Sequence, residues 1–347
     1  MQNTDIKLTI SSSPHVRTNE GTSSIMLDVI IALIPALAVA IYIFGIQALI
    51  VTVTSVVASL FFEWAYRKLL HKSKTIGDFS AIVTGILLAY CLPVSTPLWI
   101  IIVGDFFAIV IVKQLFGGIG QNFVNPALAA RAFLFSYPVV MSTWVKPLSY
   151  SSFWDTNMTD AITGATPLAS LSNSVLPEGI NLMQAFFGQV GGSMGEISAF
   201  ALILGGIYLI IRRVISPRIP LAYLLTVAVI TFICPRGNDN LIWMAWNLFS
   251  GGVMLGAIFM ATDYVTSPIT PVGQIIYGIG CGLLTVFIRY FGSYPEGTSY
   301  AILLMNICVW LIDKATMPRR FGYTRQMKKA EKAKLKSEKA AAKEVKA

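Results

Sequence analysis

The sequence predicts an all-α polytopic membrane protein with about ten transmembrane helices. Of its 347 residues, 55% are hydrophobic and only 12% are charged, whereas ordinary globular chains carry about 25% charged residues. Apolar runs long enough to enter a bilayer recur along the whole chain. These observations exclude a soluble domain.

Ten apolar segments can be drawn as spans, five in each half of the chain. They cover residues 25–44, 48–64, 81–92, 98–116 and 126–144 in the first half, and 197–211, 221–234, 241–261, 273–290 and 300–312 in the second. Several are shorter than the roughly 20 residues of a full crossing. We expect the third and the tenth to be half-spanning or broken helices.

The basic residues gather in alternate loops and in the tail, which predicts the orientation. Under the positive-inside rule, both termini are cytoplasmic and the long central loop is extracytoplasmic. This places the chain in the cell membrane as a multi-pass protein. The predicted organisation is a cytoplasmic amino-terminal segment (1–24), a first transmembrane half (25–144), an extracytoplasmic loop (145–196), a second transmembrane half (197–312) and a basic cytoplasmic tail (313–347).

Five spans per half give the halves opposite orientations, the arrangement of transporters built from inverted repeats. Both halves also contain glycine-rich stretches, at 117–126 and at 278–282. Such stretches are typical of broken helices that line a cavity or a buried site, because free backbone groups cannot face lipid. Close packing between helices through small residues explains them equally well.

Two ionisable residues lie deep in the predicted spans, Asp105 and Arg131. A charge at that depth is costly and marks a candidate functional site. Asp105 is therefore a candidate for the path of a cation or proton, and a structural ion pair between Asp105 and Arg131 is the alternative. The four cysteines are scattered and there are only two histidines, so the sequence predicts neither a metal site nor a locally encoded iron–sulfur cluster.

The longest polar interval contains the run Asp-Ala-Ile-Thr-Gly-Ala-Thr at residues 160–166. Gly164 permits a positive φ, and Pro167 favours an extended backbone at Thr166, so the Thr166 hydroxyl is expected to point outward from a stiff loop. On this pattern alone, an ordinary hydrogen-bonded turn is the simpler interpretation.

Five stretches together resemble one family, the D subunit of the Rnf complex and the homologous B subunit of the sodium-pumping NADH:quinone reductase. They lie between about residues 25 and 320, and the length and the Ser-Tyr-Pro-Glu-Gly run favour the Rnf type. The stretches are residues 160–166, Gly-Ser-Met-Gly-Glu at 192–196, Ala-Thr-Asp-Tyr-Val-Thr-Ser-Pro at 261–268, Arg-Tyr-Phe-Gly-Ser-Tyr-Pro-Glu-Gly at 289–297, and Phe-Gly-Gly-Ile-Gly-Gln-Asn-Phe-Val-Asn-Pro-Ala-Leu-Ala-Ala-Arg-Ala-Phe at 116–133.

The resemblance implies a covalent flavin. In this family the phosphate of FMN is esterified to the last threonine of the first motif, here Thr166, by a flavin transferase outside the cytoplasm. The remaining motif residues would be recognised by that transferase; they are Asp160, Thr163, Gly164 and Ala165.

The resemblance also implies a function in electron transport. Such complexes carry electrons from reduced ferredoxin to NAD⁺ through iron–sulfur and flavin subunits and export Na⁺ or H⁺, so this subunit would not be catalytic alone. A second, non-covalent flavin (riboflavin) near the cytoplasmic side is also expected from the family. For Asn122, Asn125 and Arg131, a contact with flavin or a neighbouring subunit competes with a structural role in a broken helix.

Three other functions remain open at this point. A B-type subunit would deliver electrons to quinone in a Na⁺-pumping NADH:quinone reductase. A urea-transporter-like channel or solute transporter would use the same spans and Asp105, but would not need the Thr166 motif. An assembly scaffold would not need the Thr166 hydroxyl for electron transfer.

Overall fold

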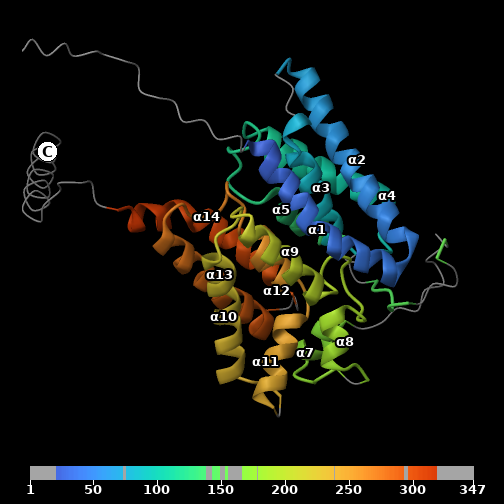
Figure 1. Ribbon diagram of the computed structural model, residues 1–347, viewed down its shortest axis with the longest axis vertical. Helices are drawn as coiled ribbons and strands as arrows, with labels where there is room; N and C mark the ends of the chain where they lie inside the picture. The colour runs from blue at the N-terminus through green and yellow to red at the C-terminus, as the bar shows by residue number, and fades with distance from the viewer. Residues whose placement is uncertain are drawn as a thin grey trace, which may run out of the picture.

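The computed structural model is built from helices, as expected for an all-α protein (Figure 1). All its described secondary-structure elements are helical. The structure describes residues 21–72, 76–137, 143–148, 153–154, 166–177, 179–237, 239–292 and 296–318.

The first half begins with two long helices that are separated by Gly45, whose φ of 71° breaks the helical backbone. After the fourth helix, the backbone widens into a π-helix, η2. The elements are α1 (Thr22–Phe44), α2 (Ile46–Leu69), the 3₁₀ turn η1 (Ile76–Asp78), α3 (Ser80–Tyr90), α4 (Leu98–Phe106), η2 (Phe107–Gln114) and α5 (Pro126–Leu134).

Two short helices precede the second half, which contains a broken span. Here α11 and α12 are bent by 64° around Ser250, Gly251 and Gly252, and α12 continues as the π-helix η4. The elements are α7 (Pro167–Ser172), α8 (Leu182–Phe187), α9 (Ala199–Ile211), α10 (Arg218–Ile233), α11 (Asn240–Phe249), α12 (Val253–Leu255), η4 (Gly256–Met260), α13 (Pro271–Phe291) and α14 (Thr298–Thr316).

Several of these helices are long and apolar enough to cross a membrane. Four pass by length and composition, namely α1, α2, α13 and α14, and the bent pair α11–η4 makes a fifth. Large apolar side chains are exposed along the outward faces of α10, α13 and α14, where lipid would cover them. The protein is therefore a multi-pass membrane protein, while the total of ten spans stays a prediction.

The structure confirms one expectation about individual spans and corrects two. The third segment is indeed short, since α3 has 11 residues. The prediction of a broken tenth span is wrong, because α14 is continuous over 19 residues. The predicted fifth span reaches residue 144, yet α5 ends at Leu134 after nine residues.

The glycines at 278–282 do not interrupt a helix, because they lie inside the unbroken α13. A Cβ on Gly278 would lie 2.9 Å from the carbonyl oxygen of Ile219, and one on Gly282 would lie 2.7 Å from Cβ of Thr226. These glycines therefore let α13 approach α10 closely, as small residues do between membrane helices. The break in the second half lies at Gly251 instead, with φ of 69°.

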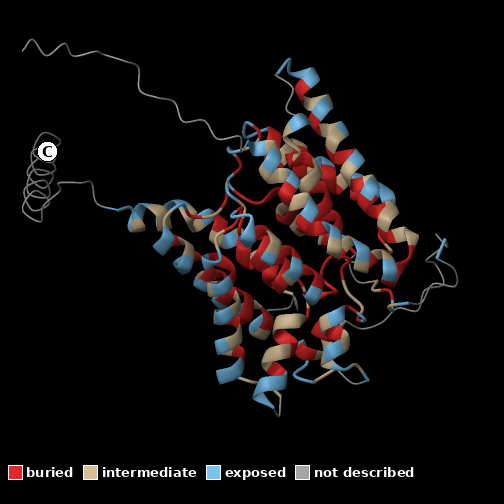
Figure 2. Ribbon diagram, viewed as in Figure 1, coloured by how far each residue is buried: buried red, intermediate tan, exposed pale blue. Residues whose placement is uncertain are grey.

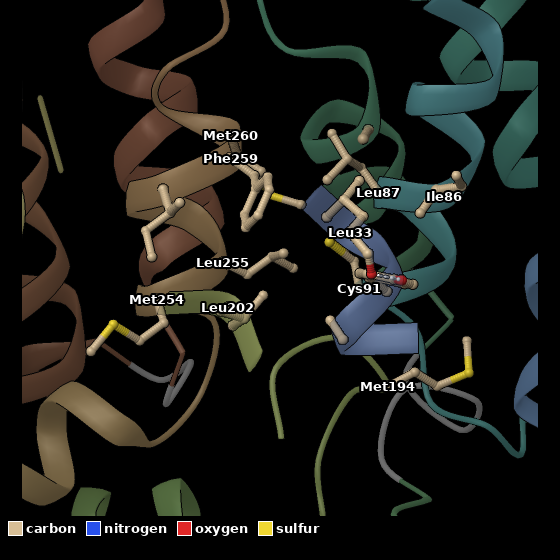
Figure 3. Close-up of a cluster of buried hydrophobic side chains, with 14 of the residues drawn as sticks. Leu33, Ile86, Leu87, Cys91, Met194, Leu202, Met254, Leu255, Phe259 and Met260 are labelled. Atoms are coloured by element: carbon tan, nitrogen blue, oxygen red, sulfur yellow. Dashed lines mark hydrogen bonds between the residues drawn. The ribbon is translucent and has the colours of Figure 1, made fainter. Parts of the chain in front are cut away.

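The two halves share an order of packing. In each half the second helix packs against the third and fourth, and the fourth contacts the fifth, while α1 and α9 pack on each other. Figure 3 shows Leu33 of α1 between Leu87 of α3 on one side and Leu255 of α12 on the other. The buried residues accordingly gather where the halves meet, as Figure 2 shows. This shared order supports two repeats, while their opposite orientation stays a prediction.

Candidate functional site

A cavity of about 550 Å³ lies beside the amino-terminal end of α7. We call it the Thr166 cavity, because Thr166 is part of its wall together with residues from 135–136, 144, 190–197, 249–251 and 296–300. Three of the stretches that carried the family resemblance supply its wall or the residues behind it, in 116–133, 192–196 and 289–297. Its volume lies in the range of small-molecule and cofactor sites.

Thr166 is held at this cavity by the local structure of α7. Its backbone is extended, Pro167 occupies the first helical turn, and the Thr166 Oγ1 accepts a hydrogen bond from the backbone N–H of Ala169 at 3.3 Å. Buried Leu168 and Leu171 pack α7 into a small cluster with Trp243 and Trp246 of α11. The hydroxyl is thus an N-cap on a helix that is anchored by apolar packing. Asp160, Thr163, Gly164 and Ala165 lie outside the described residues.

The stretch 192–196 brings a carboxylate to the cavity by packing against α3. The backbone N–H of Gly195 donates to the carbonyl of Tyr90 at 3.0 Å, and a Cβ on Gly195 would lie 2.3 Å from Cβ of Tyr90. Only glycine allows this approach. The next residue, Glu196, then meets Arg131.

Arg131 of α5 is 1% exposed and binds two carboxylates at once. Its Nη1 lies 2.7 Å from Oε1 of Glu196, and its Nη2 contacts Oε2 of Glu296 and, at 3.4 Å, Oγ of Ser193. The predicted ion pair between Arg131 and Asp105 is therefore wrong. Arg131 instead joins the first half of the chain to the second.

One guanidinium neutralises only one of the two carboxylates. Burial raises the pKa of Glu196 to about 8, although the charge of Arg131 opposes the rise. Burial also favours the neutral form of Glu296, but the charge of Arg131 together with hydrogen bonds from Glu196 and Arg131 outweighs this and lowers the pKa of Glu296. Glu196 is therefore the member that holds a proton near neutral pH.

The cavity wall includes buried polar atoms that have no hydrogen-bond partner among the described residues. They are the hydroxyl oxygens of Ser250 and Ser299. Arg289 supports this part of the wall, since it donates to the backbone carbonyls of Asn247 at 2.6 Å and Ser250 at 2.9 Å. Buried polar groups are nearly always paired, so these atoms indicate a polar ligand. A flavin ring, with its row of donors and acceptors, fits both the volume and these atoms.

A second, smaller cavity of about 100 Å³ lies elsewhere in the bundle. We call it the Lys113 cavity, because Lys113 lies in its wall, with Ser80, Asn122 and Asn125. Asn125 caps α5 by accepting from the N–H of Ala127 at 3.1 Å and donates to Met260 O at 3.3 Å. The structure therefore separates the three predicted flavin contacts. Arg131 lies behind the Thr166 cavity, and both asparagines lie at the Lys113 cavity.

Asp105 belongs to neither cavity wall but faces α2. Its Oδ1 accepts from Oγ of Ser59 at 2.8 Å and Oγ of Ser55 at 3.0 Å. One turn further along α2, Glu63 meets Lys113 of η2 at 3.3 Å. This buried polar face was not predicted from the sequence, although polar residues recur at every fourth position of α2, at Ser55, Ser59, Glu63 and Arg67.

Comparison with known proteins identifies relatives along nearly the whole chain. A model described as the NQR2, RnfD, RnfE family matches residues 9–322. The D subunit of the Na(+)-translocating ferredoxin:NAD(+) oxidoreductase complex of Acetobacterium woodii is 50% identical over 94% of this chain and 99% of its own length. The D subunit of the proton-translocating complex of Clostridium ljungdahlii is 44% identical over 91% of this chain and 97% of its own. The D subunit of the ion-translocating oxidoreductase complex of Actinobacillus succinogenes is 37% identical over 90% of this chain and 98% of its own.

Proposed function

The chain belongs to the NQR2, RnfD, RnfE family, and on this premise we propose that it carries FMN on Thr166, with the flavin ring in the Thr166 cavity. As the D subunit of an ion-translocating ferredoxin:NAD⁺ oxidoreductase complex, it is a component of a larger enzyme and is not catalytic alone. The flavin would pass electrons between neighbouring carriers of the complex.

The position of Thr166 at the edge of the cavity carries this proposal. Its Oγ1 accepts only one hydrogen bond in the described structure, from the Ala169 N–H, and that bond uses an oxygen lone pair. Replacing the hydroxyl hydrogen by a phosphoryl group leaves this lone pair in place. The ester can therefore form without unfolding the first turn of α7.

Different residues of the cavity wall would hold different parts of the FMN. Thr166 supplies the covalent attachment, and the unpartnered serine hydroxyls of Ser250 and Ser299 supply hydrogen bonds to a polar edge of the ring. Tyr300 and Phe135, which are also in the wall, supply aromatic faces that exclude water. Bound FMN supplies the redox chemistry, and the protein fixes its position and electrostatic surroundings.

The partners follow from the same premise. Iron–sulfur and flavin subunits of the complex would deliver and remove electrons, and an extracytoplasmic flavin transferase would recognise residues 160–166. Helix α7 lies at one end of the bundle, away from both ends of the described chain (Figure 1), which supports placing it on the side opposite the termini. Electron transfer would be coupled to export of Na⁺ or H⁺.

A second flavin, non-covalent riboflavin, remains part of the proposal. Asn122, Asn125 and Lys113 at the Lys113 cavity offer polar contacts. The cavity as it stands, at about 100 Å³, is too small for the ring, so binding there requires the wall to open. Flavin extracted from the Thr166→Ala protein tests this, because only a non-covalent flavin would remain.

Fluorescence of the denatured chain tests the covalent link. The wild-type band should fluoresce after co-expression with a flavin transferase, because a covalent flavin survives denaturation, and Thr166→Ala should be dark. Thr166→Ser should retain some signal, since serine also offers a hydroxyl. Ser172→Ala is the matched control, because its hydroxyl lies exposed on the same helix. A fluorescent Thr166→Ala band would refute the attachment site.

A further inference from the structure

We propose that Asp105, Ser55 and Ser59 form a buried site for one dehydrated monovalent cation of the size of Na⁺, between α2 and α4. The inference rests on the proposed ion coupling and specifies where this chain would hold the ion. It requires nothing of the Thr166 cavity, so the two proposals can fail separately.

The site has a carboxylate opposite two hydroxyls. Asp105 is 0% exposed, and so are Ser55 and Ser59. The serines lie one helical turn apart on α2, so both hydroxyls face the same side of that helix. Both approach the same carboxylate oxygen, at 3.0 Å and 2.8 Å.

The oxygen atoms at this point outnumber the hydrogens that could bind them. Oδ2 of Asp105 is buried and has no hydrogen-bond partner among the described residues. The Ser55 hydroxyl lies 3.0 Å from Oδ1 of Asp105 and 2.8 Å from the carbonyl oxygen of Gly85. Its single hydrogen can bond to only one of these two acceptors. A surplus of oxygen acceptors around an enclosed point is the arrangement that binds a hard cation.

Charge leads to the same conclusion. No Lys or Arg side chain forms a salt bridge with Asp105 in the described part of the chain. Lys113, on η2 directly after α4, donates instead to Glu63 at 3.3 Å and to Ser80 at 2.6 Å. A carboxylate between membrane-spanning helices without a counter-ion is strongly disfavoured. Binding a cation removes that cost.

The local backbone brings α3 close to the two serines. A Cβ on Gly85 of α3 would lie 2.9 Å from Oγ of Ser59 and 3.0 Å from the Ser55 carbonyl, so only glycine lets the Gly85 carbonyl approach the Ser55 hydroxyl. The π-helix η2 begins at Phe107, directly after α4. Such widened turns are frequent at functional sites.

A metal cation fits these atoms better than a proton. A proton would neutralise Asp105, but its single hydrogen bond would satisfy at most one of the surplus oxygen acceptors. A bound cation would instead contact both carboxylate oxygens and the two serine oxygens. The Ser55 hydrogen would then turn to the Gly85 carbonyl, which already lies 2.8 Å away.

Infrared difference spectroscopy of the purified complex under Na⁺ titration, without turnover, tests the site. We expect a saturable carboxylate band with NaCl but not with KCl or choline chloride, and we expect Asp105→Asn to abolish it. Ser55→Ala with Ser59→Ala keeps the charge and should raise the apparent Kd for Na⁺ by about tenfold or more. Thr166→Ala should leave the band unchanged.

The matched control lies in the second half of the chain. There Tyr223 of α10 and Thr285 of α13 form a buried hydroxyl contact of 2.6 Å, between the helices that correspond to α2 and α4. Tyr223→Phe removes that hydroxyl contact without removing a charge, and should leave Na⁺ binding unchanged.

Two results would overturn the proposal. One is a Na⁺ response that persists in Asp105→Asn, or, if that variant does not assemble, an unchanged Kd in the double serine variant. The other is an Asp105 band that follows pH but not Na⁺, which would identify a protonated carboxyl. A dark wild-type flavin band alongside normal Na⁺ binding would refute only the flavin proposal.

Discussion

The Lys113 cavity and the Thr166 cavity are built on the same plan. In the first half, Lys113 lies near the end of the continuous helix formed by α4 and η2 and reaches the beginning of α3. In the second half, Arg289 lies near the end of α13 and reaches the break between α11 and α12. Lys113 donates to Oγ of Ser80 at 2.6 Å, and Arg289 donates to the carbonyl of Ser250 at 2.9 Å. The two cavities therefore share this arrangement of a basic residue on the fourth helix and an acceptor on the third.

The two cavities differ in how their polar groups are satisfied. At the Lys113 cavity, Lys113 bonds to Glu63 and Ser80, and only about 100 Å³ stays empty. At the Thr166 cavity, about 550 Å³ is empty, and the hydroxyls of Ser250 and Ser299 have no partner in the described structure. The Lys113 cavity is thus closed by its own side chains, whereas the Thr166 cavity has room for a ligand.

The largest expected effect comes from the basic residues that hold each charge cluster. Arg131→Met should destabilise the protein by about 3–5 kcal/mol, because it leaves the buried carboxylate of Glu296 without this cation and removes the hydrogen bond to Glu196. Lys113→Met should cost less, about 1–3 kcal/mol, since Arg67 remains 3.8 Å from Glu63. Thermal unfolding of the purified protein measures both. Equal losses in the two variants would contradict this difference.

A pH series should affect the Thr166 cavity through Glu196. Folding raises the pKa of Glu196 to about 8, so between about pH 5 and pH 8 the folded state keeps a proton that the unfolded chain has released. Stability should therefore fall as pH rises through this window, by about 1 kcal/mol or more. The lowered pKa of Glu296 affects the stability of the folded state only at more acidic pH.

Melting temperatures of the flavin-free protein between pH 5 and pH 9 test this slope. Glu196→Gln removes the titrating group and should flatten the decline. If wild type and Glu196→Gln lose stability equally across the window, Glu196 is not the group responsible.

The smallest effect is expected from the serines, and its size differs between the two cavities. Ser250→Ala with Ser299→Ala should change the stability of the flavin-free protein by less than about 0.5 kcal/mol, because these hydroxyls have no partner there. Ser80→Ala should cost about 1–2 kcal/mol, because its hydroxyl bonds to Lys113 and to Asp78 at 2.6 Å.

The flavin-loaded protein gives the complementary result. With FMN attached, the double serine variant should show lower flavin anisotropy and easier iodide quenching, while the covalent yield stays the same. Unchanged anisotropy and quenching would mean that Ser250 and Ser299 do not contact the ring.

Hydrophobicity was sufficient to predict the class of the fold and most of its helices. It failed at Gly278 and Gly282, because a glycine that breaks a helix and one that admits a neighbouring helix look the same in the sequence. The early end of α5 at Leu134 was missed for a similar reason, since the apolar residues continue beyond the helix.

The site was only partly readable from the sequence. The family resemblance selected Thr166 and Arg131, but the partner of Arg131 depends on distant segments. Glu196 and Glu296 come 65 and 165 residues later in the chain, and only folding brings them together. The unpartnered Ser250 and Ser299 carry no sequence signal at all. By contrast, the serines opposite Asp105 follow a four-residue spacing that predicts one helix face.

Peptide mass spectrometry of the chain co-expressed with a flavin transferase shows directly whether FMN is bonded to Thr166. We expect one FMN per chain, on the peptide that contains Thr166, with fragment ions that place the phosphate on the Thr166 oxygen. An FMN adduct on another residue, or an unmodified Thr166 peptide beside an active transferase, would contradict this expectation.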